Sequence, residues 1–314
     1  MSQHHTIACQ PDHCHWGFFD AALRPVVTVA SGDTVAIDCV SGGRDVLPSD
    51  PAFEALADHR AILDALTPRL GAHILTGPVA VDGAAPGDVL QIDILSIEPR
   101  QNWGYTRIRP LVGTLPEDFP ITKIWHSGID RQRGTASLPI GMEIDLAPFF
   151  GVMGVAPPPN YGACSSIQPR EFGGNMDLKE LVAGTTLYLP VWAPGGLFSC
   201  GDGHGVQGDG EVCITALETA LAGTFRLTVR KDLRHKLPRA ETPTHFITMA
   251  FNEDLDDAAK DALRAMIDLI GEKMGLARED AYMFASLGVD LRVTQLVDGN
   301  KGIHAMLPKH FVKS

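Results

Sequence analysis

Apolar and polar residues alternate along several short segments of the chain, which is the pattern of a half-buried β-strand. In each segment every second residue is apolar, and the residues between are mostly polar. The clearest of these segments are 35–39, 90–94, 187–191, 225–229 and 289–293. The pattern therefore predicts a chain built mainly from short strands.

Part of this pattern repeats. Residues 27–37 read VTVASGDTVAI and residues 78–92 read PVAVDGAAPGDVLQI, each a strand, a turn with Gly-Asp and a second strand. Residues 181–189, LVAGTTLYL, form a looser third copy. Gly-Asp before a strand supplies the turn geometry that joins neighbouring strands. The repeat favours a β sandwich or barrel over a doubly wound sheet.

Helical periodicity is confined to the last third of the chain. Apolar residues recur at helical spacing over 255–274, with Asp254 before them and Gly275 after them, which suit the two ends of a helix. A shorter helix is expected over 278–286, followed by a last strand and a tail over 302–312. We therefore expect a β-rich α+β fold, with a β-rich body over 1–220 that carries the functional site and an α+β portion over 221–314 packed on it without a flexible linker.

Composition narrows the class of protein. The chain has 314 residues, of which 45% are hydrophobic, so a sizeable core can form. With 26 basic and 38 acidic residues, the formal charge is −12, which disfavours nucleic acid and anionic membranes as partners. The chain has no run of 18 apolar residues, and its first residues lack the basic and apolar regions of a signal peptide. We expect a cytoplasmic protein that binds neither nucleic acid nor membrane.

The six cysteines indicate reduced thiols. They form no CxxC pair, and a chain of this length needs no disulfides for stability. Four residues of metal-binding types do gather near the start of the chain, but their spacing matches no structural zinc template. These residues are Cys9, His13, Cys14 and His15.

Residues 199–211, SCGDGHGVQGDGE, carry the densest candidate chemistry of the chain. Two Asp, one His and one Glu lie among five glycines, which let the backbone approach a small ligand closely. Asp202 and His204 are two residues apart, so both point to the same side of an extended segment. Glu211 heads an apolar run. A set of tight turns or a calcium loop is an alternative, although the spacing does not match an EF-hand.

This segment and several others together resemble the acetamidase/formamidase family. The chain carries, in the family's order, HWG at 15–17, SGDTV at 31–35, LTGPVAV at 75–81, PFFGVMGVAP at 148–157, GGNMD at 173–177 and GDGHGVQGDGE at 201–211. The resemblance implies hydrolysis of a small amide, such as formamide, acetamide or a cyclic amide, by an enzyme that is at least a homodimer and in some relatives carries zinc. Cys200 and the run RQNWGY at 100–105 depart from the family's pattern and leave the substrate open.

An unactivated amide resists water, and a metal answers this by polarising the carbonyl and lowering the pKa of water toward ~7. We hypothesise that Asp202 and His204 bind a divalent metal, with zinc as the first choice, and that His15 is the third ligand on the strength of its motif. Glu211 is then the candidate general base. If Glu211 is a ligand instead, the base is Asp209 or Glu143.

Two other motifs are candidates for substrate binding. Asn175 and Asp177 in GGNMD can position the amide nitrogen or support a ligand, although they can also form a turn in which Asp177 caps residues 178–182. Gly151 and Gly154 belong to a run of small residues that leaves room for a small substrate.

Two other classes of function stay open at this stage. In a thiol amidase, Cys200 or Cys164 is the nucleophile and a neighbouring Glu or His is the base. In a non-catalytic module, the β body holds a small polar ligand or a structural calcium ion. The first class depends on an accessible, activated thiol, and the second predicts binding without release of ammonia.

Overall fold

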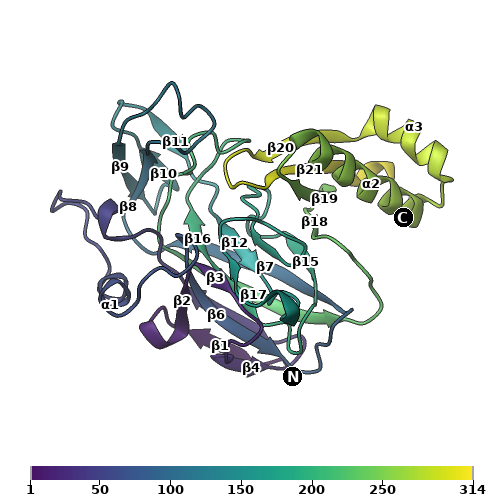
Figure 1. Cartoon of the computed structure of the whole chain (residues 1–314), viewed down its shortest axis with the longest axis horizontal. Helices are drawn as coiled ribbons and strands as arrows, with labels where there is room; N and C mark the ends of the chain where they lie inside the picture. Colours follow the sequence, from purple (N-terminus) through teal and green to yellow (C-terminus); the bar gives the residue numbers. More distant parts are fainter. Residues whose placement is uncertain (1, 313–314) are drawn as a thin grey trace.

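The computed structural model describes residues 2–312, and strands dominate it, as the alternation predicts (Figure 1). Its largest sheet has nine strands. In spatial order they are β1 (His4–Ile7), β5 (Thr34–Asp38), β17 (Leu221–Arg230), β7 (Val89–Pro99), β15 (Thr186–Pro190), β18 (Arg239–Glu241), β19 (His245–Asn252), β21 (Lys301–Pro308) and β20 (Asp290–Gln295).

A six-stranded sheet packs against the first part of this large sheet. Its order is β14 (Gly173–Asn175), β12 (Phe149–Gly154), β16 (Phe198–His204), β6 (Ile74–Val81) and β2 (Cys14–Trp16), with β4 (Val27–Val29) paired to β6. The main hydrophobic core lies between the two sheets. Phe225 of β17 meets Phe150 of β12 and Phe198 of β16, in both cases with ring centroids 5.6 Å apart. This β body is the sandwich-like part of the predicted β-rich α+β fold.

The repeated Gly-Asp turns do not join neighbouring strands, which corrects the prediction. β4 pairs with β6, whereas β5 pairs with β1 and β17, so the first turn crosses from the six-stranded to the nine-stranded sheet. The second turn makes the same crossing from β6 to β7. Each turn is held by its aspartate, since Asp33 accepts from the backbone N–H of Ala30 and Asp88 from that of Ala85. The repeat therefore marks sheet-to-sheet corners.

Smaller elements surround the body. A four-stranded antiparallel sheet stands beside the large sheets, in the order β11 (Glu143–Asp145), β10 (Thr135–Ser137), β9 (Lys123–Asp130) and β8 (Trp103–Ile108) (Figure 1). β13 (Cys164–Ser165) pairs with β3 (Phe18–Phe19). The short helix α1 (Ala57–Ala65) lies at the edge of the body. Single 3-10 turns occur at Pro11–His13, Arg44–Val46, Pro159–Tyr161 and Lys309–Phe311.

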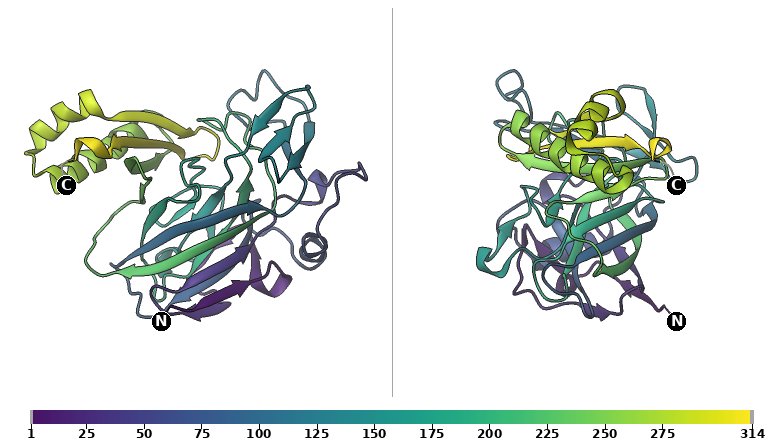
Figure 2. Two further views of the ribbon diagram at one scale, coloured as in Figure 1. Left: turned by 180° about the vertical axis from the view of Figure 1, so that it is seen from behind. Right: turned by 90° about the vertical axis from the view of Figure 1, so that its right-hand side faces the viewer.

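The helices predicted in the last third are present. α2 (Leu255–Met274) begins after Asp254, whose carboxylate accepts from the backbone N–H groups of Asp256 and Asp257, and it ends at Gly275 with φ of 67°. α3 is Arg278–Gly288. Both helices cover one face of the β19–β21–β20 end of the large sheet, and this lobe projects from the β body (Figure 2). No helix among residues 2–312 is long and apolar enough to cross a membrane.

The prediction of a tail over 302–312 is wrong in part, because most of this segment belongs to the strand β21 (Lys301–Pro308). β21 lies between β19 and β20, and its residues 302–307 are all buried. Helix side chains pack on Ala305 and Leu307, while Met306 reaches the main core. A strand covered on both faces shows no alternation, so the period of two is lost.

The two-part division into 1–220 and 221–314 stays a prediction. The boundary coincides with the start of β17, which pairs with β5 and β7 along its length. The nine-stranded sheet then continues without interruption from β1 in the body to β20 in the helical lobe.

Candidate active site

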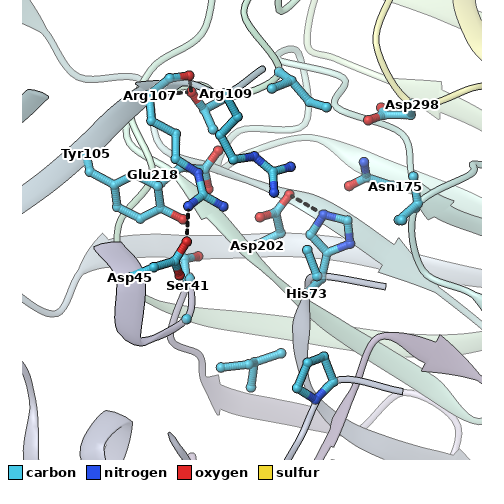
Figure 3. Close-up of a pocket in the computed structure, with 18 of the residues that line it drawn as sticks. Ser41, Asp45, His73, Tyr105, Arg107, Arg109, Asn175, Asp202, Glu218 and Asp298 are labelled. Atoms are coloured by element: carbon cyan, nitrogen blue, oxygen red, sulfur yellow. Dashed lines mark hydrogen bonds and ion pairs between the residues drawn. The ribbon is translucent and has the colours of Figure 1, made fainter. Parts of the chain in front are cut away.

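A cavity of about 260 Å³ lies where several distant segments meet (Figure 3). Asp202 comes from β16, Tyr105 and Arg107 come from β8, and Asn175 ends β14. Further walls come from the loop at 41–45, the segments 68–74 and 211–218, and the turn at 296–300 between β20 and β21. The helical lobe therefore contributes to the cavity through its strand turn.

Asp202 and His204 point to the same side of β16, as their spacing predicts. The His204 Nε2 atom lies 3.2 Å from Asp202 Oδ2. β16 pairs with β12 in a register that sets Gly151 opposite Asp202. A Cβ atom on Gly151 would lie 2.4 Å from Asp177 Oδ1 and 2.7 Å from Asp202 Oδ2, so only glycine leaves room for these carboxylates.

Glu218 joins this pair through two isolated strand bridges. Its backbone bridges to His204 on one side and to Tyr105 of β8 on the other. One carboxylate oxygen of Glu218 lies 3.3 Å from His204 Nε2, and the other is buried with no hydrogen-bond partner among residues 2–312. Three acidic or imidazole side chains thus converge on one point at the inner end of the cavity.

The GGNMD segment supplies another carboxylate. The backbone N–H groups of Met176 and Asp177 both donate to the carbonyl of Gly151, which fixes Asp177 beside β12. Asp177 Oδ1 lies 3.9 Å from His204 Nδ1, and neither carboxylate oxygen has a hydrogen-bond partner within residues 2–312. Asn175 is buried and lines the cavity, and its side-chain oxygen has no hydrogen-bond partner in the described part of the chain.

Two more carboxyl groups complete the cluster, Glu211 and Asp298. Glu211 Oε1 lies 3.9 Å from His204 Nε2. The loop that carries Glu211 is tied to β20, since Gly210 donates to the Thr294 carbonyl and accepts from the Leu296 N–H. Asp298 follows this strand, and its carboxyl group is near enough to that of Asp177 for the two charges to interact. The helical lobe thereby orients both residues.

The backbone at three of these carboxylates is strained. Asp177, Asp202 and Glu211 have φ values of 49°, 56° and 44°, in the left-handed region that side chains with a Cβ atom rarely adopt. Such conformations cost roughly 1–3 kcal/mol each and persist only where the surrounding structure imposes them. They cluster here around one imidazole, which is typical of a functional site.

The charges in the cluster are unbalanced. Its five carboxyl groups face two imidazoles, and within residues 2–312 none of the five forms an ion pair with Lys or Arg. Four of them are buried, and the side chain of the fifth, Asp202, is only 12% exposed. These carboxyl groups are Asp177, Asp202, Glu211, Glu218 and Asp298.

The imbalance shifts the pKa of each group. Burial, reinforced by the Asp202 carboxylate, raises the pKa of Glu218 to about 7. Burial and the Asp177 carboxylate likewise raise the pKa of Glu211 and of Asp298 above the ordinary range. Protons must therefore neutralise part of the cluster unless a cation does so.

The pKa values of Asp202 and His204 shift in the direction opposite to the one that burial alone would cause. Burial opposes the charged form of both groups. The imidazoles of His73 and His204 nevertheless hold the pKa of Asp202 below its ordinary value. The carboxylates of Glu218 and Asp202 raise the pKa of His204 well above its ordinary value. The two groups thus form a charged pair in the absence of any other cation.

Gln207 fixes which nitrogen of His204 faces the carboxylates. The amide nitrogen of Gln207 donates to the Asp177 carbonyl, so its side-chain oxygen accepts from His204 Nδ1, 2.9 Å away. The Nε2 atom of neutral His204 then directs a lone pair at Asp202, Glu211 and Glu218. A lone pair facing carboxylates is repulsive, and either a proton on Nε2 or a divalent cation between Nε2 and the carboxylates removes the repulsion.

The donor set fits such a cation. Asp202, His204 and Glu218 offer two oxygens and one nitrogen within 4.8 Å of one another, and Asp177, His204 and Glu211 offer a second such set. One imidazole with carboxylates suits zinc and other divalent metals. Because Gln207 occupies His204 Nδ1, the Nε2 set of Asp202 and Glu218 is the better arranged of the two.

The structure brings together only part of the residues predicted from the sequence. It gathers Asp202, His204, Glu211, Asp177, Asn175 and Gly151. His15 lies apart from the cluster, because its Nε2 atom hydrogen-bonds Ser199 Oγ at 3.1 Å and its ring packs on Phe18 and Phe19. Gly154 does not line the cavity, and a Cβ atom at this position would lie less than 3 Å from Phe19 and Gly174.

The two alternative bases also lie apart. Glu143 is exposed and forms a bidentate ion pair with Arg133 on the small sheet. Asp209 is paired with Lys179 at 3.0 Å and with Arg292 at 3.1 Å. Neither residue lines the cavity.

Three site residues were missed by the sequence analysis. Glu218 had a usable signal, since it is a lone carboxylate in the apolar run ITALETAL at 214–221. His73 precedes β6, and its Nε2 atom lies 3.9 Å from Asp202 Oδ2, but nothing in its neighbourhood marks it. Asp298 lies in the segment VDGN, which is typical of an ordinary turn.

Comparison with known proteins decides the family. A model of the acetamidase/formamidase family matches residues 2–163 and 160–312. The chain belongs to the acetamidase/formamidase family. Among curated relatives, the acetamidase of Mycolicibacterium smegmatis is 28% identical in an alignment of 200 positions that covers 45% of this chain and 49% of that protein. The chain matches between 49% and 64% of the length of the curated family members it resembles.

Solved structures of acetamidase/formamidase proteins share the whole fold. An acetamidase from Bacillus halodurans is 31% identical and superposes with a TM-score of 0.84, covering 98% of each chain. A predicted acetamidase/formamidase from Thermoanaerobacter tengcongensis is 26% identical with a TM-score of 0.86, covering 99% of this chain and 97% of that one. The β-rich α+β architecture is therefore that of the family.

The close fit around Gly151 gives a first prediction. We expect Gly151→Ala to lower the free energy of unfolding by roughly 1–3 kcal/mol, because the methyl group enters the space of Asp177 and Asp202. Gly208→Ala is the matched control, since no atom lies within 4 Å of the added methyl group there. Urea unfolding of both variants checks this, and equal stability would contradict the tight packing.

Proposed function

We propose that this protein hydrolyses a small amide to a carboxylate and ammonia. The observation that carries the proposal is the set of five carboxyl groups around His204, nearly all withdrawn from water at the inner end of a cavity of about 260 Å³. Membership in a family whose relatives include an acetamidase and a formamidase supports the same reaction. Non-peptide C–N bonds are then the target.

We propose that Asp202, His204 and Glu218 hold a divalent metal, with zinc as the first choice. Their three atoms converge, Gln207 directs the free nitrogen of His204 at the carboxylates, and Glu218 keeps one oxygen without a partner. When bound, such an ion supplies polarisation of the amide carbonyl and a lower pKa for water. His73 lies beside Asp202 and limits the orientations of its carboxylate.

Two further residues of the site, Glu211 and Asn175, have distinct roles in the proposed reaction. Glu211 takes a proton from the attacking water and returns it to the amide nitrogen, while the water oxygen bonds to the acyl carbon and the C–N bond breaks. Burial raises the pKa of Glu211, so its carboxylate is a stronger base than an exposed one and accepts a proton once a bound cation has balanced the charges of the cluster. Asn175 lines the cavity with an unpaired side-chain oxygen, which can accept from the amide nitrogen of the substrate.

The thiol mechanism has less support. Cys200 is buried on β16 against Cys39, with the sulfur atoms 3.8 Å apart. Burial raises the pKa of the Cys164 thiol, which lowers the share of reactive thiolate. Among the described residues, the lining of the cavity includes no cysteine.

A structural calcium ion stays a prediction. A third set of metal-binding residue types lies between the 199–211 segment and the helical lobe. Its members are Glu180, Asp209 and His304. Lys179 and Arg292 already form ion pairs with these carboxylates. The set is therefore better explained as a salt-bridge network that connects the 199–211 segment to the helical lobe.

The homo-oligomer also stays a prediction, as does the cytoplasmic location. Seven of the 16 exposed large hydrophobic residues among 2–312 lie between positions 111 and 144, on the small sheet and its loops. Burial of such residues between two copies of the chain would remove apolar area from water. Sedimentation equilibrium tests this directly, with a mass of at least two chains expected and a single-chain mass contradicting it.

The proposed base gives a prediction for activity. We expect Glu211→Gln to lower kcat for ammonia release by about 10²–10⁴-fold while metal content stays unchanged, because the amide side chain cannot take up the proton. Glu143→Gln is the matched control, since Glu143 is exposed and pairs with Arg133 outside the cavity. The assay measures ammonia from formamide, acetamide, propionamide and a cyclic amide. Full activity of the Glu211→Gln variant would remove Glu211 from this role.

A further inference from the structure

The wall of the cavity that faces the carboxylate cluster is cationic. Tyr105, Arg107 and Arg109 alternate along β8 and its continuation, so their side chains lie on one face of the strand. All three line the cavity, and Figure 3 shows both guanidinium groups on its upper side. Two guanidinium groups in one wall of a cavity suit an anionic group on the ligand.

The two arginines differ in their partners. Arg107 Nη1 lies 2.5 Å from Asp45 Oδ2, an aspartate with 67% of its side chain exposed. Arg109 forms no ion pair and no side-chain hydrogen bond with any of residues 2–312, and its Nε atom is buried without an acceptor. An unpaired guanidinium in a cavity is a ready partner for a carboxylate, which it can bind through two parallel hydrogen bonds.

The arginines do not serve to balance the carboxylate cluster. The charged side chains that shift the pKa of Arg109 are Arg107, which lowers it, and Asp45, which raises it. The ion pairs of the cluster are made with His73 and His204 only, among residues 2–312. The cavity therefore has two separate polar regions, a cluster of carboxylates and imidazoles and a cationic wall.

The size of the cavity allows a ligand that reaches both regions. Its volume of about 260 Å³ corresponds to ~9 water molecules at their share of liquid volume. Formamide and acetamide have only three and four non-hydrogen atoms by their formulas, roughly half of that number or less. Room is left on the side of Arg109 when a small amide lies against the cluster.

We propose that the substrate is an amide that also carries a carboxylate, such as the monoamide of a short dicarboxylic acid. This proposal rests on the proposed amide hydrolysis and adds the substrate class. The carboxylate binds Arg109, with Arg107 and Tyr105 beside it, and the amide group lies at Asp202 and Glu218. In the reaction the oxygen of water bonds to the acyl carbon, the C–N bond breaks, and the nitrogen leaves as ammonia, so the product is a dicarboxylate.

The first test compares substrates. The wild-type enzyme is assayed for ammonia release from malonamate, succinamate and glutaramate, each beside the neutral amide of the same chain length. We expect kcat/KM to be about 10- to 100-fold higher for the best anionic amide, since one charge-assisted pair is gained. Equal values for anionic and neutral amides would overturn the substrate class and leave amide hydrolysis intact.

The second test changes the arginine. Arg109→Gln should lower the anionic-to-neutral ratio of kcat/KM by about 10-fold or more, and Arg109→Lys should restore part of it, because charge returns without the planar fork. Arg264→Gln is the control, since Arg264 is exposed on α2 and pairs with Asp261. An unchanged ratio in Arg109→Gln would overturn the assignment of Arg109.

Calorimetry separates this proposal from amide hydrolysis itself. Binding of succinate, the product expected from succinamate, to the wild-type and Arg109→Gln proteins is measured directly, because the enzyme does not consume it. Succinate binding that depends on Arg109, in a protein that hydrolyses no amide, would support the anion site and overturn the proposed reaction. Absence of succinate binding by the wild-type protein would overturn the anion site.

Discussion

The repulsion among closely packed carboxyl groups is the constraint on which the site depends. Asp177, Asp202, Glu211, Glu218 and Asp298 are largely withdrawn from water around one imidazole, and within residues 2–312 none pairs with Lys or Arg. Isolated buried charges are costly, so this arrangement persists only if protons or a cation neutralise it. The pKa values of Glu211, Glu218 and Asp298 are raised for the same reason, because the ionised forms of these groups are destabilised. In the proposed function, a divalent ion on the Nε2 side of His204 meets this need for neutralisation, and the metal-bound cluster acts on the amide.

The rest of the fold supplies positions for these groups. β16 carries Asp202 and His204, and the glycine opposite them on β12 leaves the space that their side chains fill. Strand bridges bring in Glu218, and the helical lobe contributes Asp298 and holds the Glu211 loop through β20. Because the large sheet is continuous from the body to the lobe, a movement of the lobe would displace two carboxyl groups at once.

Local patterns in the sequence predicted what depends on local structure. The alternating strands, α2 with Asp254 and Gly275 at its ends, and the shared side of Asp202 and His204 all follow from periods of two or 3.6 residues. The Gly-Asp turns were recognised, but the sheets that they join depend on packing between distant strands. His73 and Asp298 reach the cavity by the same long-range packing, and no local sequence pattern marks them. His15 hydrogen-bonds Ser199, whereas its motif predicted a metal ligand.

The metal proposed at Asp202, His204 and Glu218 can be tested by measuring metal content and activity in the same samples. The protein is assayed for bound divalent metal per chain and for ammonia release as purified, after prolonged chelation and after zinc is restored. We expect one tightly held ion per chain at the Asp202–His204–Glu218 set, with activity lost on its removal and recovered with zinc. Full activity in a metal-free protein would contradict it.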